Sequence, residues 1–374
     1  MRPANEIELI ERIHASGRQL VIAATGGGSG AISALLEVPG ASATVLEAVV
    51  PYAERALAAW LGGPPDHACS ERTARAMAMA AFERARVVSE ADPRSLVGVG
   101  VTASLATRRP KRGAHRIHVA WQTAAATASV SCELAKGEQS RAEEESIATQ
   151  LTLDAIAEAC GVAAEPLTTA SIREAAECRE MQAPTAWSEL LLNERSMLAV
   201  RGAISEQSRK LLFPGAFNPL HAGHREMASI ATARYGLPMM YELSISNVDK
   251  PPLDFLELDA RLGQFGDEVV LVTRAATFVE KAILLPNSIF IVGVDTIARI
   301  ADPHYYVGDE ARRDAAIARI AAHGCRFVVF GRQMGGDFRA LSDLALPAPL
   351  AALCDEVPES EFRADISSTE LRRE

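Results

Sequence analysis

The chain has 374 residues, a length that suits two domains better than one hydrophobic core. Hydrophobic residues make up 48% of it and charged residues 23%, which is the composition of a globular protein. The net charge of −10 argues against a protein that binds nucleic acid regardless of sequence, because such proteins carry a basic surface.

The cysteines and the first residues indicate the compartment. The six cysteines form no C-x-x-C pair and no zinc spacing, so we expect reduced thiols and no metal held by the protein itself. Residues 1–11 lack the apolar core of a signal peptide, and no apolar run is long enough to span a bilayer. We therefore expect a cytoplasmic protein with no membrane partner.

Near the start of the chain, a strand, a glycine-rich loop and a helix follow one another. We expect a helix at 4–15, a strand at 18–24, the loop T-G-G-G-S-G at 25–30 and a helix at 31–37. This order is typical of a phosphate-binding loop. Gly26, Gly28 and Ala31 fit the dinucleotide pattern G-x-G-x-x-A, but V-P-G at 38–40 ends the helix early and the loop has no P-loop lysine. The sequence therefore argues against a dinucleotide site.

The rest of the first half continues to alternate. Helices are expected at 70–87 and 141–160, and strands at 96–102 and 114–122. The basic loop R-R-P-K-R-G at 108–113 joins the two strands. It is either a solvated hairpin or, in this acidic protein, a patch that steers an anionic ligand.

Three stretches of this half, T-G-G-G at 25–28, V-P-G-A-S at 38–42 and V-V-P-Y at 49–52, resemble the C-terminal domain of the competence-damage protein CinA. That family includes nicotinamide mononucleotide deamidases. The resemblance implies that Thr25 occupies the position of the nucleophilic serine, with Gly26 beside it, and that Tyr52 and Thr102 match a family tyrosine and threonine.

The same alignment shows departures from the family pattern. Ala24 replaces a glutamate, Gly27 a threonine and Leu57 the lysine that would activate the nucleophile. Two alternatives stay open. The domain is either an active deamidase or a binding or dimerising module that has kept the fold and lost the hydrolysis.

Residues 166–208 are expected to form a helical connector between the two domains. Pro166 and Pro184 punctuate this stretch, and helices are expected at 171–181 and 186–200. The predicted domains are therefore 1–165, 166–208 and 209–374.

In the last domain, strands and helices alternate as in a doubly wound α/β fold. The expected strands lie at 210–213, 238–244, 268–273, 288–292 and 326–331, and the expected helices at 221–235, 255–265, 277–284, 295–301 and 309–323. A ligand of such a sheet binds at the carboxyl ends of its strands.

One such end carries the sequence L-L-F-P-G-A-F-N-P-L-H-A-G-H at 211–224. It reads as a strand, a turn and a helix start with His221 and His224 on one face. The helix start offers unpaired N–H groups to a phosphate, and Gly223 lets a ligand approach the backbone. The last residues, D-I-S-S-T-E-L-R-R-E at 365–374, place three hydroxyls and Arg372 at the start of another helix.

These two stretches resemble the G-x-F-[DN]-P-x-H-x-G-H and I-S-S-T-x-[IL]-R signatures of the nucleotidyltransferase superfamily, especially nicotinate and nicotinamide mononucleotide adenylyltransferases. The G-V-D stretch at 293–295 is similar to their G-x-D segment, while N-V-D-K-P-P at 247–252 departs from their P-P-H-K-like stretch. The resemblance implies a Rossmann-like nucleotidyltransferase fold and Mg²⁺ carried with ATP. The catalytic residues it implies are His221, His224 and Arg372. The implied binding residues are Gly215, Ala216, Phe217, Asn218, Gly223, Lys250, Arg274, Gly293, Asp295, Ser367, Ser368 and Thr369.

The sequence as a whole therefore predicts an α/β protein in which a CinA C-terminal-like domain precedes a doubly wound nucleotidyltransferase domain. The expected reaction joins ATP to a pyridine mononucleotide in NAD biosynthesis and releases pyrophosphate. The alternatives are a bifunctional deamidase-adenylyltransferase and a non-enzymatic nucleotide-binding protein. The expected partners are ATP, a phosphorylated small-molecule acceptor and a second copy of the chain.

Overall fold

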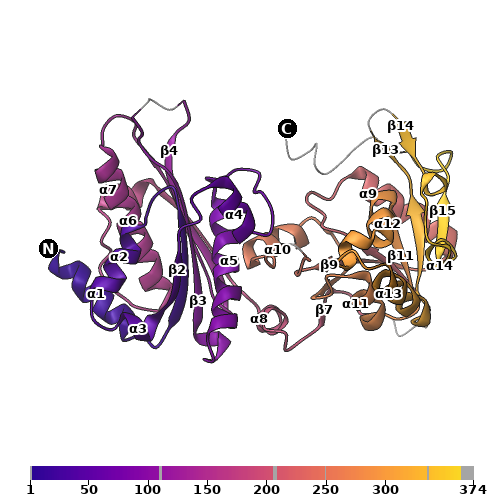
Figure 1. Cartoon of the computed structure of the whole chain (residues 1–374), viewed down its shortest axis with the longest axis horizontal. Coiled ribbons are helices and arrows are strands. Elements are labelled where there is room, and N and C mark those ends of the chain that lie inside the picture. Colours follow the sequence, from indigo (N-terminus) through magenta and orange to yellow (C-terminus); the bar gives the residue numbers. More distant parts are fainter. Residues whose placement is uncertain (1, 109–111, 205–208, 249, 335–336, 364–374) are drawn as a thin grey trace. The chain divides into compact units, whose positions relative to one another are not determined.

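The computed structural model describes residues 2–108, 112–204, 209–248, 250–334 and 337–363 (Figure 1). The chain divides into two compact units. Unit 1 comprises Met1–Leu192 and Asp249–Leu258, and unit 2 comprises Asn193–Val248 and Asp259–Glu374. Unit 1 thus includes the segment Asp249–Leu258, which the sequence analysis assigned to the last domain, 209–374. In the described part, no helix is both long enough and apolar enough to cross a membrane.

Unit 1 is built on a six-stranded mixed sheet. Its strands are, in spatial order, β2 (Val45–Val49), β1 (Gln19–Thr25), β3 (Leu96–Ser104), β4 (His115–Gln122), β5 (Ala126–Leu134) and β6 (Ala176–Gln182). The first three are parallel and the last three pair antiparallel. The carboxyl ends of β1, β2 and β3 therefore meet at one edge of the sheet.

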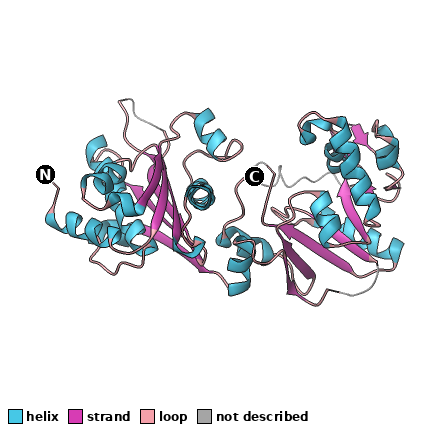
Figure 2. Cartoon of the chain, turned by 60° about the horizontal axis from the view of Figure 1, so that its bottom comes forward, coloured by secondary structure: helices cyan, strands magenta, loops and turns pink. Residues whose placement is uncertain are grey.

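Helices cover both faces of this sheet (Figure 2). On one face, α1 (Ala4–His14), α2 (Gly30–Glu37) and α6 (Arg141–Ala159) share a core with Val97, Val99 and Val101 of β3. On the other face lies α5 (Glu71–Val88). It approaches β3 so closely that a Cβ on Gly98 would lie 2.1 Å from the carbonyl oxygen of Ala78. The alternation of valine and glycine along β3 therefore serves its two different faces.

Shorter elements complete unit 1. They are α3 (Ala41–Thr44), α4 (Glu54–Trp60), η1 (Pro93–Ser95), α7 (Ala170–Ala175) and α8 (Thr185–Leu191).

Residues 166–208 do not form the expected helical connector. The helix expected at 171–181 ends at Ala175, and the chain continues as β6, which pairs with β5 at the sheet edge. The helix expected at 186–200 ends at Leu191, and β7 (Met197–Arg201) follows it and pairs with a strand of unit 2. Both strands contain good helix formers, so sheet pairing has overridden local propensity here.

Unit 2 is built on a seven-stranded sheet. Its strands are, in spatial order, β15 (Cys354–Val357), β12 (Arg326–Phe330), β11 (Ser288–Gly293), β8 (Lys210–Pro214), β9 (Met239–Ser244), β10 (Val269–Thr273) and β7. All pairs are parallel except β10 with β7. The strands expected from the sequence are confirmed within one or two residues. The edge strands β15 and β7 were not expected.

Helices flank the sheet of unit 2 as well. They are α9 (Ala222–Tyr235), α11 (Phe278–Leu284), α12 (Val294–Ala301), η2 (Pro303–Tyr306), α13 (Glu310–Ala322), η3 (Leu341–Asp343) and α14 (Ala348–Ala351). Leu212 and Phe290 share a core with residues of α11, α12 and α13, while α9 contacts β8 and β11. The hairpin of β13 (Arg332–Met334) and β14 (Asp337–Arg339) follows β12. Helix α10 (Phe255–Leu262) contains the division between the units, which falls after Leu258.

Candidate functional site

The loop between β8 and α9 is the centre of the candidate site in unit 2. Its first residue, Gly215, donates its N–H to the carbonyl oxygen of Glu242 on β9 at 3.0 Å. A Cβ at Gly215 would lie 2.6 Å from the ring of Phe217, so only glycine fits there. Phe217 has a φ of +44°, which is rare for a residue with a side chain. The backbone of this loop is therefore held in an unusual conformation.

Aromatic packing fixes the side chain of Phe217. Its ring is 1% exposed and meets the rings of Phe213, His224, Tyr241 and Phe265 at centroid distances of 5.2–5.5 Å. All four contacts have the edge-to-face geometry that aromatic pairs favour. The loop residue Phe217 thus acts as an anchor between β8 and the helix start.

The two predicted histidines lie together at the start of α9. His221 is the N-cap residue, and its ring stacks on that of His224 with 3.8 Å between the centroids. The backbone N–H of His221 donates to Nδ1 of His224 at 3.3 Å. Since Nδ1 accepts this bond, a neutral His224 carries its proton on Nε2 and presents a donor there.

Burial sets the charge of both rings. It lowers the pKa of His224 to about 4, with a smaller contribution from His221, and it also lowers the pKa of His221. Both rings are therefore neutral at neutral pH and act as hydrogen-bond partners rather than cations. The Nδ1 atom of His221 is buried without a hydrogen-bond partner among the described residues.

Other predicted residues lie at the same edge of the sheet. Gly293 ends β11, the neighbour of β8, and a Cβ there would meet open space. Asp295 follows in the first turn of α12, and its carboxylate accepts a bond of 2.6 Å from Arg332. Arg274 follows β10, and its backbone N–H donates to the carbonyl oxygen of Ser196.

The remaining candidates of the second half lie in unit 1 or outside the described residues. Lys250 is exposed and belongs to the segment of unit 1. Ser367, Ser368, Thr369 and Arg372 lie outside the described residues.

Unit 1 contains a cavity of about 400 Å³ at the carboxyl ends of β1 and β2. It is lined by Ala24, Gly26, Gly27, Ser29, Val50, Tyr52, Arg141, Ala142 and Glu145. Two of the four residues predicted for this domain, Gly26 and Tyr52, are therefore brought together. Thr25 and Thr102 are register partners in the sheet and are absent from the lining. Thr102 is fully buried, and its hydroxyl donates to the carbonyl oxygen of Ser70.

The start of helix α6 borders this cavity, and sequence reasoning did not assign its residues to a site. Arg141 donates to the carbonyl oxygen of Gly26 at 2.8 Å. Glu145 accepts from the hydroxyl of Ser29 at 3.2 Å and from the N–H of Gly30 at 3.4 Å. The only sequence signal was the charged start of the helix at 141, which also fits an ordinary N-terminus.

The position of the absent lysine is apolar in this structure. Leu57 is 3% exposed and packs in a cluster with Ala23, Leu61 and Met77. No base stands at that position to activate a nearby hydroxyl. Val50 and Tyr52, by contrast, are half or more exposed and give the cavity an apolar wall.

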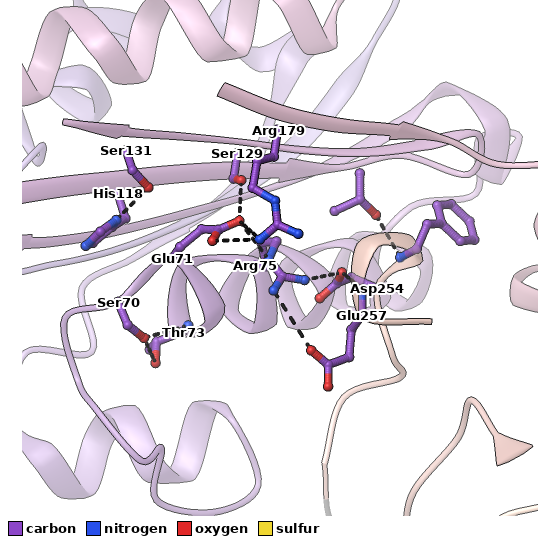
Figure 3. A network of polar contacts seen from close by, with 12 residues as sticks. Ser70, Glu71, Thr73, Arg75, His118, Ser129, Ser131, Arg179, Asp254 and Glu257 are labelled. Carbon is purple, nitrogen blue, oxygen red and sulfur yellow. Dashed lines mark hydrogen bonds and ion pairs between the residues drawn. The ribbon is translucent and has the colours of Figure 1, made fainter. Parts of the chain in front are cut away.

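A second polar cluster in unit 1 lies at the N-terminal half of α5 (Figure 3). Arg75 is buried, and its guanidinium contacts Asp254 at 2.5 Å, Glu71 at 3.4 Å and Glu257 at 3.9 Å. The backbone N–H of Phe255 donates to the hydroxyl of Thr127 at 3.0 Å. These bonds explain why the segment Asp249–Leu258, which includes the start of α10, is part of unit 1.

The model of the CinA C-terminal domain family matches residues 4–160. The chain is also similar to three solved structures, in each case over 42–43% of its length. They are competence/damage inducible protein CihA from Agrobacterium tumefaciens (23% identity, 98% of that chain, TM-score 0.33), a competence-damaged protein (CinA) superfamily protein from Escherichia coli (20%, 94%, 0.35) and a competence or damage-inducible protein from Enterobacter asburiae (15%, 98%, 0.35). No curated protein matches the chain. The first part of the chain is thus CinA-like in sequence, as its T-G-G-G and V-V-P-Y stretches suggested.

Proposed function

We propose that unit 2 joins the adenylyl group of ATP to a pyridine mononucleotide and releases pyrophosphate. The observation that carries this proposal is the stacked, neutral histidine pair at the first turn of α9, directly after the parallel strand β8. Numbered along the chain, the six parallel strands have the order 3-2-1-4-5-6, that of a doubly wound Rossmann-like sheet. The order reverses between β8 and β11, where such sheets bind nucleotides.

The reaction needs positioning more than a protein nucleophile. A phosphate oxygen of the acceptor attacks the α-phosphorus of ATP, and the bond from that phosphorus to the oxygen bridging the β-phosphate breaks. The bonding electrons leave with pyrophosphate. In this scheme Nε2–H of His224 donates to a phosphate oxygen that gains negative charge, and His221 contacts the same chain of phosphates. A neutral His224 keeps its proton on Nε2, because Nδ1 accepts from His221, so it can donate this bond at neutral pH.

The loop and the edge of the sheet supply the other contacts. The sequence resemblance suggested the N–H groups of Gly215 and Phe217 for the α-phosphate or the acceptor, but that of Gly215 is bonded to Glu242. We propose the N–H groups of Ala216 and Phe217, with the side chain of Asn218, instead. Gly223 lets the phosphates approach the start of α9. Arg274 and Asp295 remain candidates for the adenine, ribose or acceptor.

The last residues complete the proposed phosphate site. On the strength of the sequence resemblance alone, Ser367, Ser368, Thr369 and Arg372 would bind the β- and γ-phosphates. Mg²⁺ bound to ATP would add positive charge at the phosphates. The described residues contain no group of three His, Cys, Asp or Glu side chains placed to hold a metal ion.

A direct assay tests this proposal. The full chain is incubated with MgATP and either nicotinate or nicotinamide mononucleotide, and dinucleotide and pyrophosphate are measured together. Equal amounts of both products are expected with at least one acceptor. Absence of product with either mononucleotide would refute the choice of acceptor, and tight ATP binding without turnover on a wider panel would favour a nucleotide-binding protein instead.

For unit 1 we propose binding of a mononucleotide without hydrolysis. The cavity supports binding, because its lining combines the cationic side chain of Arg141 with the exposed ring of Tyr52. The buried Leu57 argues against hydrolysis, since no amine stands there to activate Thr25.

Two measurements separate this proposal from the bifunctional alternative. Nicotinamide mononucleotide is expected to bind the full chain without release of ammonia, and Tyr52→Ala is expected to weaken the binding. Ammonia release that Thr25→Ala abolishes would establish a bifunctional enzyme. Release that Thr25→Ala leaves unchanged would mean that another residue carries the reaction.

A further inference from the structure

Two side chains from the last turn of α10 and the residues that follow it hold the loop of the candidate nucleotide site. The side-chain amide of Gln264 donates from Nε2 to the carbonyl oxygen of Phe217 at 2.9 Å and accepts at Oε1 from the N–H of Leu220 at 2.7 Å. Arg261 is buried and donates from Nη1 to the carbonyl oxygen of Ala216 at 3.0 Å. Three backbone groups of one five-residue turn are thus bound from a single neighbouring segment.

The turn needs such support because its backbone is strained. Phe217 has a φ of +44°, a region that residues with a side chain rarely adopt. The buried ring of Phe217 fixes the side chain, but it leaves the carbonyl groups on either side free to rotate. The bonds from Gln264 and Arg261 fix both of those carbonyl groups.

The hydrogen bond between Gln264 and Leu220 also affects the histidines, because Leu220 is the residue before His221. Leu220, which Gln264 binds, directly precedes His221, the N-cap of α9 whose N–H orients the ring of His224. Gln264 is itself bound from α9, because Arg225 donates to its backbone carbonyl oxygen at 3.3 Å. Loop and helix start are therefore held as one assembly.

We propose that Gln264 and Arg261 are positioning residues of the nucleotide site, which keep the loop at 216–220 in the conformation that binds phosphate. They act through the loop and the orientation of His224. This inference rests on the proposed function of unit 2.

The chemistry of Gln264 gives a graded test. Gln264→Glu keeps an acceptor for the N–H of Leu220 and loses the donor to Phe217, whereas Gln264→Ala loses both bonds. Arg261→Lys keeps a cation with a single point donor. Gln333→Glu, in the β13 hairpin of the same unit, and Arg312→Lys, an exposed residue of α13, are the matched controls.

The first readout is amide hydrogen exchange of the full chain without ligand. Gln264→Ala is expected to speed exchange at Leu220 at least tenfold, while Gln264→Glu leaves that amide protected. The second readout is MgATP affinity by calorimetry, expected to fall about tenfold in Gln264→Glu and Arg261→Lys and further in Gln264→Ala. The controls are expected to match the wild type in both.

Folded Gln264→Ala with unchanged exchange at Leu220 and unchanged MgATP affinity would overturn the positioning role. If Gln264→Ala fails to fold, Gln264→Glu and Arg261→Lys decide it through affinity. A wild type that binds no MgATP would refute the proposed function instead, and exchange at Leu220 would then test the support of the loop by itself.

Discussion

The ion pair of Arg75 with Asp254 gives the sharpest prediction about how unit 1 is assembled. The two side chains are 6% and 8% exposed and 2.5 Å apart, and Asp254 also caps α10 by accepting the N–H of Glu257 at 2.9 Å. Burial alone would lower the pKa of Arg75, but the carboxylates of Asp254 and Glu71 outweigh it and raise that pKa above its usual value. The cation is therefore a fixed part of the structure.

Arg75→Met leaves the carboxylate of Asp254 buried without its cation. Breaking a buried pair from one side costs about 3–5 kcal/mol of unfolding free energy. Arg75→Met combined with Asp254→Asn removes both charges and keeps an N-cap side chain, so it is expected to recover at least about 1 kcal/mol of that loss. The control is Arg84→Gln, whose pair with Glu47 is partly exposed and screened by solvent, so its loss is expected to change stability little.

The assay follows from the positions of the tryptophans. All three, Trp60, Trp121 and Trp187, lie in unit 1, so their fluorescence during urea denaturation of the full chain reports that unit. Arg75→Met is expected to shift the transition to lower urea, with partial recovery in the double variant. A shift no larger than that of Arg84→Gln would show that the segment Asp249–Leu258 is not an integral part of unit 1.

Three further predictions concern the two candidate sites. His224→Ala is expected to lower adenylyl transfer about 100-fold or more, measured as pyrophosphate release, because it removes the donor that we propose for the phosphates; activity within threefold of the wild type would exclude His224 from that role. Gly26→Ala is expected to destabilise unit 1 by more than about 2 kcal/mol, since φ is +79° and the new Cβ would lie 1.9 Å from the carbonyl oxygen of Ala103. Gly113→Ala, where a Cβ meets nothing within 4 Å, is its control, and equal effects in urea melts would count against the packing argument. Because its pKa is lowered, His224 binds fewer protons in the folded state than in the unfolded state. Its contribution to the free energy of unfolding is therefore fully present above pH 6.5 and is lost as pH falls toward about 4. It amounts to about 3 kcal/mol, and His224→Phe should flatten that part of the stability profile followed by circular dichroism, whereas identical profiles would contradict the lowered pKa.

Much of the fold was predictable because its signals are local. The apolar run before Gly215 predicted β8, and the turn with two histidines predicted the start of α9. The glycine loop at Thr25 likewise predicted the end of β1 and the start of α2. In these places the residues that form the element also mark its ends.

The elements and contacts that the sequence did not predict depend on partners far away along the chain. β6 contains good helix formers and becomes a strand only because β5 offers an edge. Arg75 and Asp254 are 179 residues apart, and neither carries a local pattern that predicts their pairing. The sequence likewise gives no signal that Gln264 supports the loop, since a glutamine after a helix usually faces solvent.

In the proposed function, the start of α9 directs transfer of the adenylyl group. This proposal is tested most directly with ATP labelled at the α-phosphate, incubated with Mg²⁺, the full chain and nicotinate or nicotinamide mononucleotide. We predict that the label appears in a dinucleotide in step with unlabelled pyrophosphate, and that His224→Ala loses both products. Label that stays in ATP with both acceptors, or that appears in the dinucleotide equally fast in His224→Ala, would contradict the account.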